Sequence, residues 1–324
     1  MEILKIVLLF VGFGLLIKGA DWLVAGAASI AKRYNVPNIV IGLTIVAFGT
    51  STPELIVSLF ASMNGSTDIA IGNVIGSNSC NILLILGISS IIYPLSVKSN
   101  TVWKEIPLSL LAAVLVWVLA NDMILDGNPR VEITRSDGLV LLGFFAIFMY
   151  YTFDIAKADA NNPTTIESDE IKILSLFWSI IFIILGLTSL VVGGNWIVEG
   201  AVYIAKSFGL SEALIGLTIV AIGTSLPEMA TSVMAALKKQ DDIAIGNVVG
   251  SNIFNVFFIL GTSATVSPLK FDPKVNTDIY VTMAASLFLF IFCFSGKKHQ
   301  LERWEGSLMF LGYVSYTAFL IMRG

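Results

Sequence analysis

The segment Ile41-Gly-Leu-Thr-Ile-Val-Ala-Phe-Gly-Thr-Ser-Thr-Pro-Glu54 occurs twice in this chain, and the repetition decides how the molecule is organised. Its second copy is Ile215-Gly-Leu-Thr-Ile-Val-Ala-Ile-Gly-Thr-Ser-Leu-Pro-Glu228, which differs at two positions. The two glutamates are 174 residues apart. Self-similarity at a fixed offset indicates a duplicated structural unit.

The match continues beyond this segment without a gap. Asp68-Ile-Ala-Ile-Gly-Asn-Val-Ile-Gly-Ser-Asn78 aligns at the same offset with Asp242-Ile-Ala-Ile-Gly-Asn-Val-Val-Gly-Ser-Asn252, with one change. The repeat therefore covers whole elements, and each half of the chain carries both motifs.

The composition is that of a membrane protein. Of 324 residues, 56% are hydrophobic and 13% charged, whereas about 25% of the residues of a soluble domain are charged. The mean hydropathy is +0.86, and several apolar stretches approach the roughly 20 residues that a helix needs to cross a bilayer. We predict ten transmembrane helices, over residues 3–33, 37–62, 69–93, 104–121, 136–153, 173–206, 211–237, 243–266, 277–295 and 305–323.

These spans predict an all-α polytopic membrane protein made of two inverted five-helix repeats. Five is an odd number, so the second copy of a tandem duplication enters the membrane upside down. Residues 1–153 form the first repeat, 154–172 a polar linker and 173–324 the second repeat. The first span of each half reads as one long tilted helix. The linker is too short for a regulatory domain of about 50 residues or more.

The basic residues predict an orientation in the plasma membrane. Eleven Lys and Arg residues fall on the side of the linker and seven on the other side. Because basic loops stay in the cytoplasm, we expect a cytoplasmic linker and both termini outside.

Glu54 and Glu228 lie within apolar spans, where a charge costs about 2.5 kcal/mol or more. Each follows a proline, which has no N–H to donate and therefore opens the helix and frees carbonyl groups. Thr50 and Ser51 precede Glu54 by four and three residues and so share its face, and Thr224 and Ser225 repeat this arrangement. The pattern predicts a cluster of oxygen atoms around each glutamate.

The third span of each half adds a polar stripe on one helix face. The stripe consists of Asn73, Ser77 and Asn81 in the first half and of Asn247, Ser251 and Asn255 in the second. Glycine pairs beside it allow close helix contact. Carboxylate, hydroxyl, amide and carbonyl oxygens suit hard cations such as Ca²⁺ and Na⁺. Two cysteines in apolar spans and one histidine in a basic loop make a disulfide framework or zinc site improbable.

Structural explanations remain open for the same residues. The glutamates could form ion pairs or stay protonated, although no basic residue lies near them on their helices. The Ser and Thr hydroxyls could bond to carbonyls four residues earlier. The polar stripe could serve only to hold helices together by hydrogen bonds, which is the preferred interpretation for Asn73 and Asn247. Asp21 and Glu199 are better explained by pairing with Lys18 or Lys206, and Asp21 corresponds to Asn195 in the second half.

The duplicated Gly-Thr-Ser-x-Pro-Glu and Gly-Asn-Val-x-Gly-Ser-Asn segments resemble the two α-repeats of the sodium/calcium exchanger superfamily. The length and the short linker are similar to the prokaryotic branch. The resemblance implies a cluster of cation sites at the membrane midplane and two long first helices that slide as a gate.

The resemblance also implies a ligand set. Ca²⁺ would be held by the carboxylates of Glu54 and Glu228 and the carbonyls of Thr50 and Thr224, with Asn81 and Asn255 lining the middle. The implied Na⁺ ligands are Ala47, Ser51 and Ser77 on one side and Ala221, Ser225 and Ser251 on the other. Several relatives, including potassium-dependent ones, carry aspartate where this chain has Asn255, which disfavours potassium co-transport.

The predicted function is secondary antiport of Na⁺ for Ca²⁺ by alternating access. A Ca²⁺/H⁺ antiporter is compatible with the same carboxylates, and a cation channel would need a continuous pore. An intramembrane hydrolase lacks the necessary histidine or aspartate pair, so we expect no enzyme. We further expect no cofactor, no nucleic-acid partner and function as a monomer in the lipid bilayer.

Overall fold

The computed structural model describes the chain except residues 1, 126, 128–130, 162–173, 208–220 and 324. The helical segments of the first half are α1 (Glu2–Tyr34), α2 (Asn38–Ile41), η1 (Gly42–Val46), α3 (Ala47–Thr50), α4 (Thr52–Met63), α5 (Thr67–Ser79), η2 (Cys80–Leu86), α6 (Gly87–Ile92), η3 (Thr101–Glu105), α7 (Ile106–Ala120), α8 (Asp122–Leu125) and α9 (Arg135–Asn161). Those of the second half are α10 (Leu176–Ser207), α12 (Ala221–Thr224), α13 (Leu226–Leu237), α14 (Asp241–Ile253), η5 (Phe254–Leu260), α15 (Gly261–Val266), η6 (Pro273–Val275), α16 (Asn276–Ser295) and α17 (Arg303–Arg323). The η segments are π-helical turns, except η6, which is a 3-10 helix.

The predicted all-α polytopic architecture is confirmed. Among the described residues, eight helices are long and apolar enough to cross a membrane. A ninth span is the pair Asn38–Thr50 and Thr52–Met63, whose axes differ by 49°. Part of the tenth predicted span, 211–237, lies outside the described residues, and its remainder is seen from Ala221 onward as α12 and α13.

α9 ends later than the sequence indicated. It continues to Asn161, so the first residues of the stretch predicted as a linker from 154 onward are helical. Residues 162–173 of that stretch lie outside the described part of the chain.

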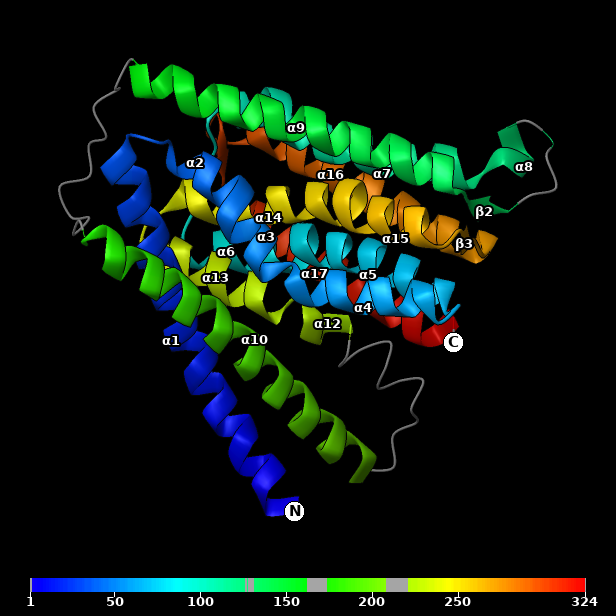
Figure 1. Ribbon diagram of the computed structural model, residues 1–324, viewed down its shortest axis with the longest axis horizontal. Coiled ribbons are helices and arrows are strands. Elements are labelled where there is room, and N and C mark those ends of the chain that lie inside the picture. The colour runs from blue at the N-terminus through cyan, green and yellow to red at the C-terminus, as the bar shows by residue number, and fades with distance from the viewer. Residues whose placement is uncertain (1, 126, 128–130, 162–173, 208–220, 324) are drawn as a thin grey trace.

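α1 and α10 occupy equivalent positions in the two repeats and pack against each other in opposite directions (Figure 1). A Cβ atom on Gly12 would lie 2.7 Å from the carbonyl oxygen of Gly193, and one on Gly26 would lie 2.7 Å from that of Ser179. Partner numbers thus fall along α10 as they rise along α1. Equivalent helices that run antiparallel are the mark of an inverted repeat.

These two helices are also the long, tilted ones. α1 has 33 residues and α10 has 32, so each is about 50 Å long, well over the roughly 30 Å of a bilayer core. In Figure 1 the pair runs obliquely away from the stack of the other helices. Because a helix longer than the bilayer core has to tilt, the oblique pair agrees with the predicted long first spans.

The remaining helices form a buried centre and an outer layer. The spans Thr67–Ile92 and Asp241–Val266 are the most buried of the described helices, whereas Arg135–Lys157 and Arg303–Arg323 are the most exposed. α9 packs on α15, α16 on α7 and α17 on α6. The Gly-Asn-Val-x-Gly-Ser-Asn segments of both repeats therefore lie at the centre of the molecule.

Two short antiparallel strand pairs join the ends of these helices. β1 (Leu95–Ser96) pairs with β4 (Gln300–Leu301), and β2 (Glu132–Ile133) pairs with β3 (Leu269–Lys270). The sequence did not predict them. Two residues per strand are too few to give a periodic pattern, so only the tertiary contacts of the loops create these pairs.

Candidate cation site

A helix break sets the position of each glutamate. α3 ends at Thr50 and α4 begins at Thr52, and Ser51 between them has a ψ of 8°, outside the α-helical range. Ser225 has a ψ of 7° between α12 and α13. The cause lies in the sequence, because the proline that follows cannot donate to the preceding turn. Each glutamate then stands in the first turn of a new helix, where the helix dipole favours negative charge.

The two glutamates are buried and each is bound by the opposite repeat. Glu54 and Glu228 are both 1% exposed. Ser51 Oγ donates to Glu228 Oε1 at 2.9 Å, and Ser225 Oγ donates to Glu54 Oε1 at 3.3 Å. Ser77 Oγ also donates to Glu54 Oε1, at 3.4 Å. The spacing placed Ser51 on the face of its own Glu54, but the helix break turns its hydroxyl to the other half.

Asn73 and Asn247 hold the broken helices to the third spans. Asn73 Nδ2 donates to the backbone carbonyl of Glu54 at 3.2 Å and to Ser58 Oγ at 2.9 Å. Asn247 makes the equivalent bonds, at 3.2 Å to the carbonyl of its own glutamate and at 2.9 Å to Ser232 Oγ. The structure therefore gives both asparagines the structural role that was preferred from the sequence.

Four asparagines connect the two third spans. Asn81 Nδ2 donates to Asn252 Oδ1 and Asn255 Nδ2 donates to Asn78 Oδ1, both at 3.0 Å. Asn81 and Asn255 lie in the π-helical turns η2 and η5, a local geometry that recurs at functional sites. Sequence reasoning missed Asn78 and Asn252 as part of this cluster. The Gly-Ser-Asn ending shared by both motifs was the available signal.

Several buried oxygens of this cluster have no hydrogen-bond partner within the described structure. They are Glu54 Oε2, Glu228 Oε2, Ser251 Oγ, Asn81 Oδ1 and Asn255 Oδ1. A buried polar atom without a partner is costly and calls for an explanation. Asn252 Nδ2 of the same cluster also has no partner, but the five oxygens are the type of atom that binds a desolvated hard cation.

The carboxylates are also without a basic neighbour in the part of the chain that the structure describes. None of the ion pairs between described residues includes Glu54 or Glu228. The same residues contain no group of three His, Cys, Asp or Glu side chains that could hold a metal ion. The site thus combines two acidic groups with uncharged oxygens, which suits Ca²⁺ and Na⁺ better than zinc.

A pocket of about 240 Å³ reaches the helix breaks from one side of the molecule. Both prolines line it, together with Thr224, Ile56 on α4 and the stretch of α10 that includes Asn195. The pocket thus touches the residues next to both glutamates.

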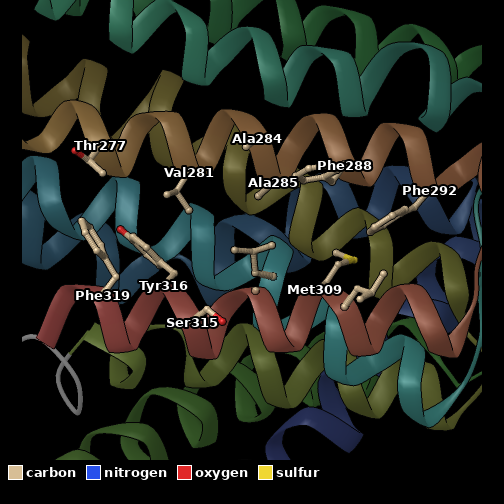
Figure 2. Close-up of a pocket in the computed structure, with 13 residues that line it drawn as sticks. Thr277, Val281, Ala284, Ala285, Phe288, Phe292, Met309, Ser315, Tyr316 and Phe319 are labelled. Atoms are coloured by element: carbon tan, nitrogen blue, oxygen red, sulfur yellow. The ribbon is translucent and has the colours of Figure 1, made fainter. Parts of the chain in front are cut away.

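A larger groove lies between α16 and α17, with a volume of about 630 Å³. Figure 2 shows the apolar side chains that line it, including Phe288, Phe292 and Phe319. The described residues that line this groove include none of the predicted cation ligands. It is an apolar surface in the outer layer and is separate from the site.

The repeated geometry around the two glutamates agrees with the comparison to protein families. The model for "Sodium/calcium exchanger protein" matches residues 4–153 and 178–322. These two ranges are the halves on either side of the linker. The chain belongs to the sodium/calcium exchanger family.

Similar proteins support this membership along nearly the whole chain. "Putative antiporter CaxA" of Alkalimonas amylolytica is 39% identical over 97% of this chain and 98% of its own length. "Sodium/calcium exchanger MaX1" of Methanosarcina acetivorans is 33% identical, with 97% of each chain covered. A solved structure of the sodium-calcium exchanger NCX_Mj, with zero Na⁺ and Ca²⁺, is 36% identical at a TM-score of 0.83, covering 98% of this chain and 99% of that chain.

Family membership confirms the resemblance and the broad function. The protein is a multi-pass membrane exchanger of the family that transports Ca²⁺ and Na⁺, and it is not an enzyme.

Two further predicted ligands of this exchanger, Ala47 and Thr50, lie in the first helix of the broken pair. Ala47 is fully buried, and Gly250 on α14 packs so closely that an added Cβ would lie 2.9 Å from it. Thr50 Oγ1 bonds back to Val46 O at 3.1 Å and also reaches Asn247 Oδ1 at 3.0 Å. The back-bonding that the sequence left open therefore occurs at Thr50, which leaves its backbone carbonyl as the predicted ligand.

Some predictions for this exchanger involve residues outside the described part. The side chain of Ala221, one of the implied Na⁺ ligands, belongs to this group, although the residue itself begins α12. The pairing expected between Glu199 and Lys206 also falls there, since the Lys206 side chain is not described. The pairing of Asp21 with Lys18 is confirmed, at 2.8 Å.

Proposed function

We propose that this exchanger is a secondary antiporter that exchanges Na⁺ for Ca²⁺ at the central site. The observation that supports it best is the pair of buried glutamates, each bound by a serine of the opposite repeat. One site of formal charge near −2 can be neutralised either by one Ca²⁺ or by several Na⁺ ions. Competition for the same carboxylates then couples the two fluxes.

The proposed Ca²⁺ ligands are the carboxylates of Glu54 and Glu228 and the backbone carbonyls of Thr50 and Thr224. The unpartnered Oε2 atoms support the first pair, and the helix breaks beside the two threonines support the second. Oxygen ligands of this kind, including bidentate carboxylates, match the preferences of Ca²⁺.

The proposed Na⁺ ligands lie on either side of this centre. They are Ala47, Ser51 and Ser77 on one side and Ala221, Ser225 and Ser251 on the other, with Asn81 and Asn255 in the middle. Ser51, Ser77 and Ser225 contact the glutamates directly. Sodium bound at these positions would compete with Ca²⁺ for the same carboxylate oxygens.

Transport follows the alternating-access scheme of inverted-repeat carriers. The long helices α1 and α10 move as a gate while the core with its two broken helices stays in place. A sodium load of more than two charges per Ca²⁺ makes the exchange electrogenic, as is usual in the family. The proposed setting is the plasma membrane, with a cytoplasmic linker, both termini outside and a single chain as the working unit.

Proton coupling is the second candidate. Its basis is that two buried carboxylates can take up protons in place of sodium. The serine hydroxyls on both glutamates favour sodium, because they supply the neutral oxygens that a monovalent metal ion needs and a proton does not.

The deciding experiment measures radiolabelled Ca²⁺ uptake into proteoliposomes under one imposed gradient at a time. Sodium-loaded vesicles in sodium-free buffer should take up Ca²⁺, while a pH gradient without sodium should drive little uptake. Vesicles without protein control for leak. Uptake that follows the pH gradient and ignores sodium would reject sodium coupling in favour of Ca²⁺/H⁺ exchange, and unitary currents would indicate a channel.

A further inference from the structure

Among the described residues, an ion-pair cluster connects a gate helix to the core on one side of the site. Lys238 Nζ lies 2.6 Å from Asp21 Oδ1, and it also donates to the backbone carbonyl of Asp21 at 2.9 Å. Lys18 Nζ contacts the other carboxylate oxygen, Asp21 Oδ2, at 2.8 Å. Asp21 lies on α1 and Lys238 caps the end of α13, the broken helix that carries Glu228. We call these contacts the Asp21–Lys238 latch.

The latch lies on the side of the molecule where α1 ends and α10 begins. Asn38 Nδ2 donates to Gln240 Oε1 at 3.1 Å there, and Arg33 donates to the carbonyl of Leu174 at 2.7 Å. We call this the linker side, because Leu174 lies two residues after the end of the central linker. The proposed orientation makes it cytoplasmic.

The repeat has no second latch at the equivalent place. At the offset of 174 residues, Asp21 corresponds to Asn195 and Lys238 corresponds to Asn64. Two neutral amides therefore occupy the positions that correspond to the carboxylate of Asp21 and the ammonium group of Lys238. Asn195 lines the pocket that leads to the helix breaks, so the unlatched side is the open side.

Two side chains on the linker side are also more deeply buried than their repeat equivalents on the opposite side. On the latched side Val24 and Thr50 are each 1% exposed. Their equivalents on the other side, Val198 and Thr224, are half-buried and line the pocket. The latch therefore holds the gate helix against the core on the side where the route to the site is closed.

We propose that Asp21 and Lys238 are positioning residues that hold the exchanger closed on the linker side and open on the opposite side. The inference rests on the proposed alternating access but not on the identity of the coupling ion. A contact made in one of two states stabilises that state by its own free energy. Because the opposite interface carries Asn195 and Asn64, the two access states are unequal in energy even though the core motifs are nearly identical.

Cysteine accessibility gives a direct test that needs no ion gradient. Ile56 lines the open pocket and is 49% exposed, and its repeat equivalent on the linker side is Ala230. The native cysteines, Cys80 and Cys293, are buried. Labelling rates of Ile56→Cys and Ala230→Cys with a hydrophilic thiol reagent, in purified protein, report the openness of the two sides.

Loss of the latch should shift the ratio of these rates toward the linker side. We expect Asp21→Asn and Lys238→Asn each to lower the Ile56→Cys to Ala230→Cys ratio by about two- to fivefold, the range for partly exposed ion pairs. The double variant should add little to either single change, and the exchanged pair Asp21→Lys with Lys238→Asp should restore part of the ratio.

A matched control is the ion pair between Lys98 and Asp242, which has the same length of 2.6 Å but involves neither α1 nor α10. Asp242→Asn should leave the ratio unchanged. The reciprocal variant, Asn195→Asp with Asn64→Lys, should slow labelling of Ile56→Cys by building a second latch.

An unchanged ratio in both single latch variants would overturn the proposal, as would an equal shift in Asp242→Asn. If Asp21→Asn misfolds, Lys238→Asn and the exchanged pair still decide. Failure of sodium coupling in the transport assay would leave these labelling rates untouched, so the two proposals fail separately.

Discussion

The two sides of the cation site are built from nearly the same sequence but pack differently. On the linker side α1 packs against α13, and Thr50 is fully covered. On the other side a pocket of about 240 Å³ separates α10 from the start of α4 and reaches Thr224. A pair of equivalent threonines, in equivalent motifs, is thus closed on one side and open on the other.

The sequence of the motif therefore does not determine whether its side of the site is closed or open. Glu54 and Glu228 have equal burial and exchange serine partners across the two halves. The centre of the site is therefore nearly symmetric and differs in Ser77, which donates to Glu54, and its equivalent Ser251, whose Oγ has no partner among the described residues. The asymmetry in packing begins where the gate helices meet the core. Equivalent residues of the two motifs are thus found in both packings, as the proposed alternating access requires.

The largest expected effect tests the symmetric centre. Glu54→Gln and Glu228→Gln each keep the shape of the side chain but remove one of two ligand charges, so both should lose Ca²⁺ transport and at least about tenfold in Ca²⁺ affinity. Uptake in proteoliposomes and calcium binding to purified protein measure this. Glu199→Gln, on the exposed face of α10, is the matched control. Full exchange by either glutamate variant would reject the shared site.

The next prediction concerns Asn81 and Asn255, each of which donates to an asparagine of the opposite repeat. Asn255→Asp adds a third carboxylate to the ion pocket, so the ions that transport requires should change. If the new carboxylate is ionised, it favours an extra monovalent ion, and potassium should then enhance Ca²⁺ transport. If it is protonated, Ca²⁺ transport should become more sensitive to acid. The measurement is Ca²⁺ exchange across potassium concentrations and pH, at matched protein levels.

Two controls sharpen this comparison. Asn81→Asp makes the equivalent change in the other half and should shift the same requirements. Asn255→Ala removes the 3.0 Å bond to Asn78 without adding charge, which separates the lost bond from the new carboxylate. Wild-type profiles for both aspartate variants would place these positions outside the ion pocket.

A smaller effect is expected where the two gate helices touch. A Cβ on Gly12 would lie 2.7 Å from the carbonyl oxygen of Gly193, so Gly12→Ala should push α1 and α10 apart and cost about 1–3 kcal/mol of stability. Gly14 has no heavy atom within 4 Å of an added Cβ, which makes Gly14→Ala a control on the same helix. Thermal unfolding in detergent should separate the two variants, and equal midpoints would show that the contact is not tight.

The last prediction concerns the orientation in the membrane, that is, whether the linker side or the opposite side faces the cytoplasm. A cysteine introduced at Glu167 should be protected from an impermeant reagent in intact cells, and one at Gly324 should react. Labelling after permeabilisation controls for reactivity. The reverse pattern would exchange the two sides without altering the site.

The sequence by itself determined the membrane class, the duplicated organisation and both glutamates. Long apolar stretches, an ungapped repeat and a proline before an intramembrane carboxyl are local features, and their consequences follow from helix chemistry and lipid solvation alone. The long first helices, the all-helical fold and the pairing of Asp21 with Lys18 were accessible for the same reason.

Only the tertiary structure decided which oxygens meet. The donation from Ser51 to Glu228, the entry of Asn78 and Asn252 into the asparagine cluster and the pairing of Lys238 with Asp21 all join residues 171 to 217 positions apart. Helix periodicity gives the face of a side chain but not the partner helix on that face. The closed and open sides differ for the same reason, since near-identical motifs pack against different neighbours.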